Sequence, residues 1–310
     1  MYTFIYNLYF CLKRKEKKAQ EEKREISKIA KKMIDRIEWL FNIPLRNWYM
    51  NFPSKRRGIT KKSRKQKIIV SLTSYPQRIS TVWLTIESIL HQSVKPDKII
   101  LWLAKTQFKD IEELPKTLQR QRERGLSIQF CDDLRSHKKY YYVMQKYPED
   151  LIILADDDMF YPRDTIRRLL EMHSQYPNDI CTMSAQVIEP HFEAKPSLWR
   201  NPKLKEDFKH SEKIQIFTGS GSLYPPNSLD TKAFDKKLIQ ELCPYADDLW
   251  LTFMAYRKNT KISVATPWRA FPITIYGTSE GSLWYINGAN GENDKQWKAI
   301  LEYFNGGVEC

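Results

Sequence analysis

Three consecutive aspartates, Asp156, Asp157 and Asp158, are the residues of this sequence that point most directly to chemistry. They follow an apolar run at residues 151–155, which is typical of a buried central strand, and precede residues 159–162, which indicate the start of a helix. Open α/β sheets place ligand sites just beyond the carboxyl ends of such strands. Crowded carboxylates repel one another unless a cation lies among them, so the triplet predicts a divalent metal site that can bind a diphosphate. A solvated acidic turn, or a helix cap formed by Asp158, is the alternative.

Three further segments carry groups suited to the same sheet edge. The loop after the first predicted strand offers a hydroxyl, an aromatic ring and a guanidinium, from Thr73, Tyr75 and Arg78. The small residues at 218–222 let the backbone approach a ligand closely, and Asp247 and Asp248 form a second acidic pair at the start of a predicted helix. No GxGxxG motif and no Walker P-loop occurs, so a metal ion is expected to neutralise a bound diphosphate instead. Plain turns are the alternative for both loops.

The elements that must position these residues alternate regularly between strand and helix. Apolar strand patterns occur at residues 67–72, 98–103, 127–130 and 151–155. Helical patterns occur between and after them, at residues 79–91, 110–124, 140–146 and 162–176, before an apolar, strand-like stretch at 179–187 and a polar, irregular insertion at 188–213. This alternation predicts the α/β class, with a mainly parallel sheet and helices on both faces.

The net positive charge of the chain comes from its amino-terminal part. Residues 1–67 contain 20 Lys or Arg and 6 Asp or Glu, out of 51 and 37 in the whole chain, so the remainder is neutral. Apolar residues recur at helical spacing from residue 26 to residue 41, which predicts an amphipathic helix. We therefore expect two parts, a basic helical extension and linker at 1–66 and a catalytic domain at 67–310. The extension is expected to bind an anionic membrane surface, a partner or the domain itself, with the membrane favoured.

The cysteines and histidines give little indication of a site. The five cysteines are widely spaced and form no CxxC pair, which is typical of reduced thiols in a cytosolic protein. The first twelve residues are too few to cross a bilayer, and no signal peptide is apparent. We therefore expect a cytoplasmic protein, peripheral on the inner face of the cytoplasmic membrane.

Taken together, the motifs resemble those of nucleotide-sugar-dependent glycosyltransferases of the GT-A fold, and most closely those of bacterial enzymes of surface polysaccharide assembly. The matching segments, in order, are SLTSYPQR, DDLRSHKK, ILADDDMFYP, GSGSLYPP and ADDLWL. The resemblance covers roughly residues 67–304. It implies a GT-A fold that transfers a sugar, a UDP-sugar by first expectation, to a saccharide or lipid-linked saccharide. The Gln-x-x-Arg-Trp motif of processive synthases is absent from the sequence, so one sugar per encounter is expected.

The resemblance also implies roles for individual residues. Asp156 and Asp158 resemble the two acids of the DxD motif, in which the last binds Mn²⁺ or Mg²⁺ and the first lies near the ribose or the water ligands of the metal, with Asp157 between them. Asp248, with Asp247, is similar to the pair from which inverting members draw their general base. Nucleotide contacts are implied for Thr73, Tyr75, Arg78, Asp133 and Lys139, the last two toward the base and the diphosphate. Some relatives use a distal histidine, so His191 is a further candidate ligand.

The carboxyl-terminal segment has two interpretations. By the resemblance it closes over the acceptor; alternatively its residues cap the last helix, and the residues concerned are Asn287, Asn290, Asn293, Asp294 and Trp297.

Two other classes of function remain open from the sequence. A metal-dependent hydrolase or phosphatase also gathers carboxylates at strand ends, and would release phosphate without an acceptor. A nucleic-acid-binding protein would use the basic extension, although the neutral remainder and the lack of a reader motif weigh against it.

Overall fold

The structure is a computed structural model of the 310-residue chain. It describes residues 8, 9, 11, 12, 15, 27–51, 54–189, 192–199, 210–264, 272–278 and 291–305, with only the backbone at 41 and 45. His191, Asn287 and Asn290 lie outside the described residues.

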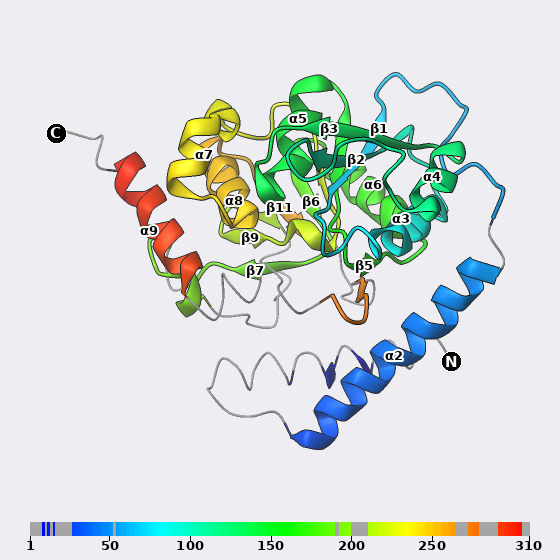
Figure 1. Cartoon of the computed structure of the whole chain (residues 1–310). Helices are drawn as coiled ribbons and strands as arrows, with labels where there is room; N and C mark the ends of the chain where they lie inside the picture. The colour runs from blue at the N-terminus through cyan, green and yellow to red at the C-terminus, as the bar shows by residue number, and fades with distance from the viewer. Residues whose placement is uncertain are drawn as a thin grey trace.

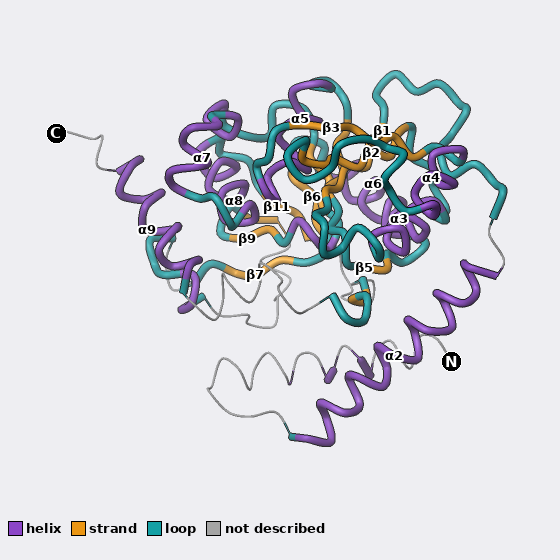
Figure 2. The backbone as a smooth tube through the Cα atoms, in the orientation of Figure 1, coloured by secondary structure: helices purple, strands orange, loops and turns teal. Residues whose placement is uncertain are grey.

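The main sheet of the described part has eight strands and is mostly parallel (Figures 1 and 2). Its order is β3 (Leu126–Cys131), β2 (Lys98–Ala104), β1 (Ile68–Thr73), β4 (Leu151–Leu154), β10 (Ser222–Tyr224), β6 (Ile180–Thr182), β11 (Ile262–Val264) and β8 (His210–Ser211). The first four strands are parallel, as are β6 and β11, whereas β10 runs antiparallel to both of its neighbours and β8 runs antiparallel to β11. The predicted α/β class is confirmed.

Helices cover both faces of the sheet because the strands are apolar on both sides. In β1, Ile68, Val70 and Leu72 pack with the helices α3 (Val82–Leu90), α4 (Lys116–Glu123) and α6 (Thr165–Gln175). Ile69, on the other side of the strand, belongs to the core formed with α5 (Lys138–Lys146), α7 (Lys236–Leu242), α8 (Asp247–Arg257) and α9 (Glu292–Asn305). The molecule therefore has two cores, one on each side of the sheet.

Three predicted elements differ in the structure. Residues 159–162 do not start a helix, because Met159–Phe160 form β5, which pairs antiparallel with β12 (Ile273–Thr274). The side chains of Thr85 and Ser88 in α3 accept hydrogen bonds from the backbone N–H groups of Met159 and Tyr161, and Pro162 follows, so α6 begins only at Thr165.

The other two differences are shorter elements than expected. The helix predicted at 110–124 is limited to Lys116–Glu123, after Pro115. The strand-like stretch at 179–187 splits into β6 and β7 (Ala185–Val187), and β7 pairs with β9 (Ile214–Ile216) in a separate sheet.

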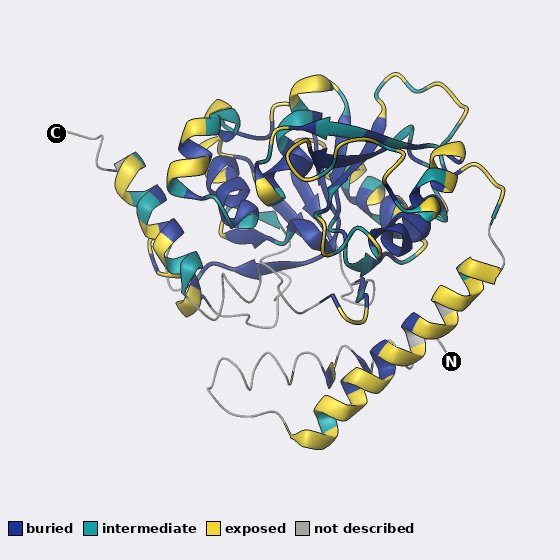
Figure 3. Ribbon diagram, in the orientation of Figure 1, coloured by how far each residue is buried: buried dark blue, intermediate teal, exposed yellow. Residues whose placement is uncertain are grey.

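The amino-terminal helix α2 (Lys28–Asn51) lies along one side of the domain and contributes to its core (Figure 1). Ile34 and Ile37 are buried in the same core cluster as α3 and β1. The rest of the helix is mainly exposed (Figure 3), including the apolar residues Ile29, Trp39, Leu40, Ile43, Trp48 and Met50. Among the described residues no helix is long and apolar enough to cross a membrane.

Candidate active site

The predicted acidic triplet lies where the sequence placed it, just beyond the end of β4. The neighbouring strand β1 ends at Thr73 and delivers Ser74 and Arg78 to the same edge. Ser74 Oγ donates a hydrogen bond of 2.6 Å to Asp157 Oδ2, and Arg78 Nη1 lies 2.7 Å from Asp157 Oδ1. The parallel pairing of β1 and β4 thus brings together groups that are about eighty residues apart in the chain.

Arg78 neutralises two of the three carboxylates. Its Nη1 is 2.7 Å from Asp157 and 3.0 Å from Asp158 Oδ2, and the guanidinium is itself largely buried. Burial raises the pKa of Asp158 to about 7, against the opposing effect of Arg78. Burial likewise raises the pKa of Asp157, although Arg78 and Ser74 oppose it. Ionisation of these two buried carboxylates is therefore stabilised by the positive charge of Arg78.

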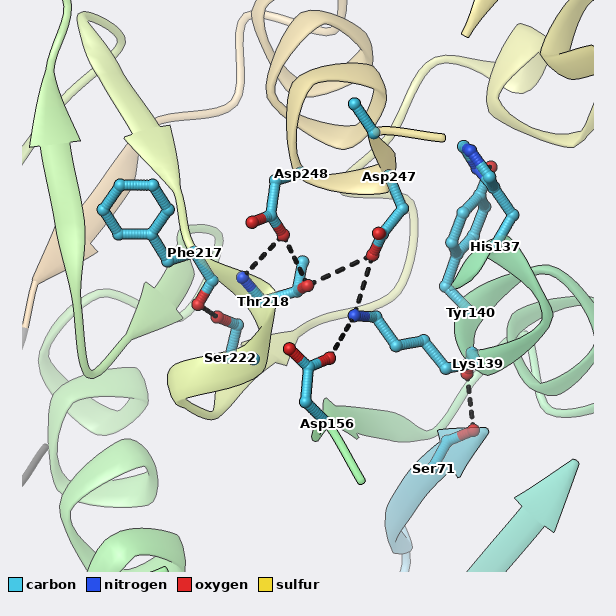
Figure 4. A network of polar contacts seen from close by, with 12 residues as sticks. Ser71, His137, Lys139, Tyr140, Asp156, Phe217, Thr218, Ser222, Asp247 and Asp248 are labelled. Carbon is cyan, nitrogen blue, oxygen red and sulfur yellow. Dashed lines mark hydrogen bonds and ion pairs between the residues drawn. The ribbon is translucent and has the colours of Figure 1, made fainter. Parts of the chain in front are cut away.

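Lys139 provides the second cation and joins the two acidic clusters (Figure 4). Its Nζ is 2.5 Å from Asp156 Oδ1 and 2.8 Å from Asp247 Oδ2, and its side chain is only 3% exposed. Burial alone would lower the pKa of Lys139, but the carboxylates of Asp156 and Asp247 raise it well above its ordinary value. Lys139 is thus a buried ammonium between two carboxylates, placed there by the first turn of α5.

The second acidic pair occupies the first turn of α8, where the helix dipole favours negative charge. Thr218 donates to Asp248 Oδ1 through both its backbone N–H (2.9 Å) and its hydroxyl (2.5 Å). Burial and the neighbouring Asp247 raise the pKa of Asp248 to about 7. Burial also raises the pKa of Asp247, but Lys139 and His137 outweigh it and the net pKa is lowered. One carboxylate of the pair is therefore held ionised, and the other titrates near neutral pH.

The turn at residues 218–220 closes the site against the triplet. Tyr161 fixes it, because the hydroxyl accepts from the backbone N–H of Asp156 at 2.8 Å and donates to the carbonyl of Gly219 at 2.6 Å. A Cβ on Gly219 would lie 1.9 Å from Asp156 Oδ2, so only glycine fits there. The small residue Gly219, in the turn that was predicted to lie close to a ligand, packs against the carboxylate of Asp156.

The remaining predicted nucleotide contacts lie around this centre with other partners. Thr73 Oγ1 donates to the carbonyl of Trp102 at 2.8 Å, and the guanidinium of Arg78 lies 5.5 Å from the centre of the Tyr75 ring. Asp133 pairs with Lys138, 2.5 Å away, and burial of Asp133 is outweighed by this cation, so its pKa is lowered. Asp133 is thus already engaged with a protein cation.

Two predicted residues near the carboxyl terminus have structural partners. The carboxylate of Asp294 accepts hydrogen bonds from the backbone and hydroxyl of Ser197. Trp297 is buried among aromatic rings, including Phe192, Trp199 and Phe253. In the structure both residues join α9 to the neighbouring loop.

A metal ion at this site would have to share its coordination with a substrate. Among the described residues, no group of three or more His, Cys, Asp or Glu side chains is arranged to hold an ion by itself. Mg²⁺ in phosphate-binding sites uses one or two carboxylates together with substrate phosphates and water, which Asp156 and Asp158 can supply from the protein side. Repulsion within the triplet does not by itself require a metal ion, because Arg78 and Lys139 already pair with its carboxylates.

Several residues of the site were not found from the sequence. Ser74 and Tyr161 lie inside the segments SLTSYPQR and ILADDDMFYP, and Thr218 begins the small-residue turn at 218–222. Their hydroxyls bond Asp157, Gly219 and Asp248. Only Tyr161 lies within three positions of an acidic motif; Ser74 and Thr218 are 83 and 30 residues from the acids that they contact, so no local signal points to them.

No family model matches this sequence, and no curated protein matches it. Solved structures that match it include TarS from S. aureus (residues 1–349), with 13% identity and a TM-score of 0.41. They also include the mannosyltransferase PcManGT from Pyrobaculum calidifontis in complex with GDP-Man and Mn²⁺, with 11% identity and a TM-score of 0.43. A third is a CMP:2-keto-3-deoxy-manno-octonic acid synthetase complexed with CTP, with 12% identity and a TM-score of 0.38.

These matches differ in extent. The match to TarS covers 67% of this chain and 60% of TarS 1–349, so the chain spans less than two thirds of that structure. The match to the mannosyltransferase covers 99% and 88%, and the match to the synthetase 64% and 89%.

Proposed function

We propose that this protein is a metal-dependent glycosyltransferase that moves a sugar from a nucleotide-sugar donor, a UDP-sugar by first choice, to a saccharide or lipid-linked saccharide. The observation that carries the proposal is the pairing of Lys139 with both Asp156 and Asp247, at 2.5 and 2.8 Å. It joins an acidic triplet suited to a metal and diphosphate to a second acidic pair suited to proton transfer. The sequence resemblance adds the setting, bacterial surface polysaccharide assembly.

The donor side of the site is formed by the triplet and the loop after β1. Asp158 and Asp156 would hold Mn²⁺ or Mg²⁺, which stabilises the negative charge that develops on a departing diphosphate. Arg78 pairs with Asp157 and Asp158 and orients their carboxylates. In this proposal Thr73, Tyr75 and Asp133 frame the nucleotide, while Lys139 sets the position of Asp156 rather than binding the diphosphate directly.

Asp248 is the proposed general base of an inverting reaction. Only one of its oxygens, Oδ1, accepts from Thr218, and the residue is partly exposed. A pKa raised to about 7 suits a base that must take a proton from an acceptor hydroxyl near neutral pH. Asp247, held ionised by Lys139, keeps that cation in place.

The proposal includes a membrane partner for the exposed face of α2. Trp39 and Trp48 are 47% and 59% exposed, and Ile29 and Met50 are more than half exposed on the same helix. Residues 1–67 carry the whole excess of positive charge of the chain. Exposed tryptophans with an excess of Lys and Arg are typical of a helix that lies in an anionic membrane surface.

Paired substitutions test the reaction. Asp158→Ala is expected to abolish Mn²⁺-dependent release of nucleoside diphosphate in a protein that still unfolds cooperatively. Asp248→Asn is expected to lose turnover, by about a hundredfold or more, and to keep donor binding in a thermal-shift assay with Mn²⁺. Asp110→Asn, on the surface, is the matched control and should behave as the wild type.

The acceptor decides between transfer and hydrolysis. Release of nucleoside diphosphate that requires a saccharide acceptor supports transfer. Acceptor-independent release of phosphate, or near-normal turnover in both variants, would show that the proposed reaction is wrong.

A further inference from the structure

The side chain of Asn42 connects α2 to a segment beside the proposed donor site. Its Nδ2 donates to the carbonyl of Thr274 at 3.2 Å, and its Oδ1 accepts from the backbone N–H of Tyr276 at 2.8 Å. The second proton of Nδ2 is directed to the carbonyl of Glu38, one turn earlier in α2, at 2.7 Å. Asn42 is 6% exposed, so its amide is buried and bonded entirely to backbone groups.

The segment that Asn42 holds, residues 272–278, contacts the donor side of the site through its other edge. The backbone N–H of Ile275 donates to the carbonyl of Asp158 at 2.7 Å. Ile273 and Thr274 pair as β12 with β5, directly after the acidic triplet. Arg78 Nη2 donates to the carbonyl of Thr278 at 2.8 Å, while Nη1 of the same guanidinium reaches Asp157 and Asp158.

The choice of asparagine at position 42 has no explanation within the helix itself. Asparagine is a poor helix former, and position 42 is buried, where an apolar side chain is more usual. Buried polar side chains persist where they are hydrogen-bonded, and here the bonding partners outside the helix are the two backbone groups of the 272–278 segment.

We infer that Asn42 is a positioning residue of the donor site, acting through the 272–278 segment on Arg78 and Asp158. While the segment is held, Arg78 Nη2 donates to the carbonyl of Thr278 and Nη1 pairs with the carboxylates of Asp157 and Asp158. With it released, the guanidinium gains rotational freedom and the backbone of Asp158 loses its partner at Ile275. The amino-terminal helix is then part of the site, in addition to the membrane role proposed for its other face.

This inference rests on the proposed function for its binding readout, so the experiment has one part that does not. Asn42→Leu is compared with Asn47→Leu, a matched change at an exposed position of the same helix, in the full-length protein. Hydrogen exchange of the Ile275 and Tyr276 amides is expected to accelerate about tenfold or more in Asn42→Leu and to stay unchanged in Asn47→Leu. Asn42→Asp keeps the acceptor for Tyr276 but places an oxygen against the carbonyls of Glu38 and Thr274, so exchange should accelerate in this variant as well.

The second part measures nucleotide affinity, which a merely structural role would not change. The Kd of UDP with Mn²⁺ is expected to rise about threefold to tenfold in Asn42→Leu, well below its unfolding temperature. In an Arg78→Ala background the same substitution should add little, because the two residues act through one path.

The outcomes separate the two proposals. If UDP and GDP both fail to bind the wild type, the donor proposal is wrong, and exchange alone then decides the role of Asn42. Equal exchange in Asn42→Leu and Asn47→Leu overturns the inference, and so does faster exchange with an unchanged Kd in a protein that binds nucleotide.

Discussion

The pKa values of the acidic side chains in this site depend on their burial and on the charges beside them. Asp247 and Asp248 are neighbours in one helical turn, yet Lys139 lowers the pKa of the first while burial raises that of the second to about 7. Lys139 itself stays charged because it lies between two carboxylates. Pairs of acids whose pKa values are pushed apart in this way are typical of sites that transfer protons.

The hydroxyl of Thr218 gives a test of the proposed base by pH dependence. Thr218 Oγ1 donates to Asp248 and stabilises its ionised form, so Thr218→Val should raise the pKa of Asp248 further. Since the base must be ionised to act, kcat/KM should fall as the pH drops below about 7 in the wild type. In the variant this fall should begin about one pH unit higher.

Initial rates between pH 5 and 9 measure the shift. Thr231→Val, at an exposed position, is the control and should leave the profile unchanged. A profile that does not move in Thr218→Val, or that moves to lower pH, would count against Asp248 as the base.

Among the elements, the short turn between β9 and β10 determines how closely the two halves of the site approach. Thr218 faces Asp248, and Gly219 packs against Asp156, so two adjacent residues of the turn Thr218–Ser220 contact the two acidic clusters. Tyr161 anchors this turn to the triplet. The local sequence indicated a Gly/Ser turn, but its contact with Asp156 depends on β10 pairing antiparallel with β4.

The close approach of Gly219 predicts a strong effect of one methyl group. In Gly219→Ala the new Cβ would meet Asp156 Oδ2 at 1.9 Å, which must displace either the turn or the carboxylate from Lys139. We expect a loss of about 1–3 kcal/mol in the free energy of unfolding, together with weaker donor binding. Urea unfolding and UDP titration measure the two effects.

Ser220→Ala is the control for this turn, because it removes the bond from Ser220 Oγ to the carbonyl of Phe217 without adding an atom. It should change both quantities much less. Equal effects in the two variants would mean that the turn, rather than its contact with Asp156, is what matters.

At the scale of the whole molecule, α2 combines residues buried in the core with residues that are exposed. One face contributes Ile34 and Ile37 to the core, so the helix is more than a tether attached to an independent domain. The predicted division of the chain into an extension at 1–66 and a domain at 67–310 stays a prediction. Trp39 and Trp48, elsewhere on the helix, are exposed.

The exposed face predicts membrane binding that can be removed without unfolding the protein. Trp39→Glu combined with Trp48→Glu should reduce partitioning onto vesicles containing anionic lipid by at least about tenfold, because both side chains leave the apolar part of the interface. Tm should stay close to that of the wild type, since both side chains are about half exposed or more. Co-sedimentation at low and high salt measures the partitioning.

Tyr303→Glu in α9 is the matched control, an aromatic residue exposed to a similar extent (48%) elsewhere on the surface. If it reduces binding as much as the tryptophan changes, the effect is not specific to α2. Equal partitioning of the wild type onto neutral and anionic vesicles would contradict the role of the basic segment.

The sequence alone predicted the strand and helix alternation from residue 67 to residue 176, the α/β class and the edge at which Asp156, Asp157 and Asp158 lie, because periodicity and chain order are local properties; the strands β8 to β12 were not predicted. It also placed Asp247 and Asp248 at the start of a helix. It failed at Met159–Phe160, where hydrogen bonds from the backbone to α3 and pairing with the distant β12 override the local pattern.

The pairing of each cation with its acid follows from the packing of the folded chain. Arg78 reaches Asp157, Lys139 reaches both Asp156 and Asp247, and Asn42 reaches a segment more than two hundred residues away. Electrostatic and hydrogen-bond energies depend on distances of a few ångströms. Such distances between remote residues are set by how the strands pair and how the helices pack, and no spacing along the chain contains them.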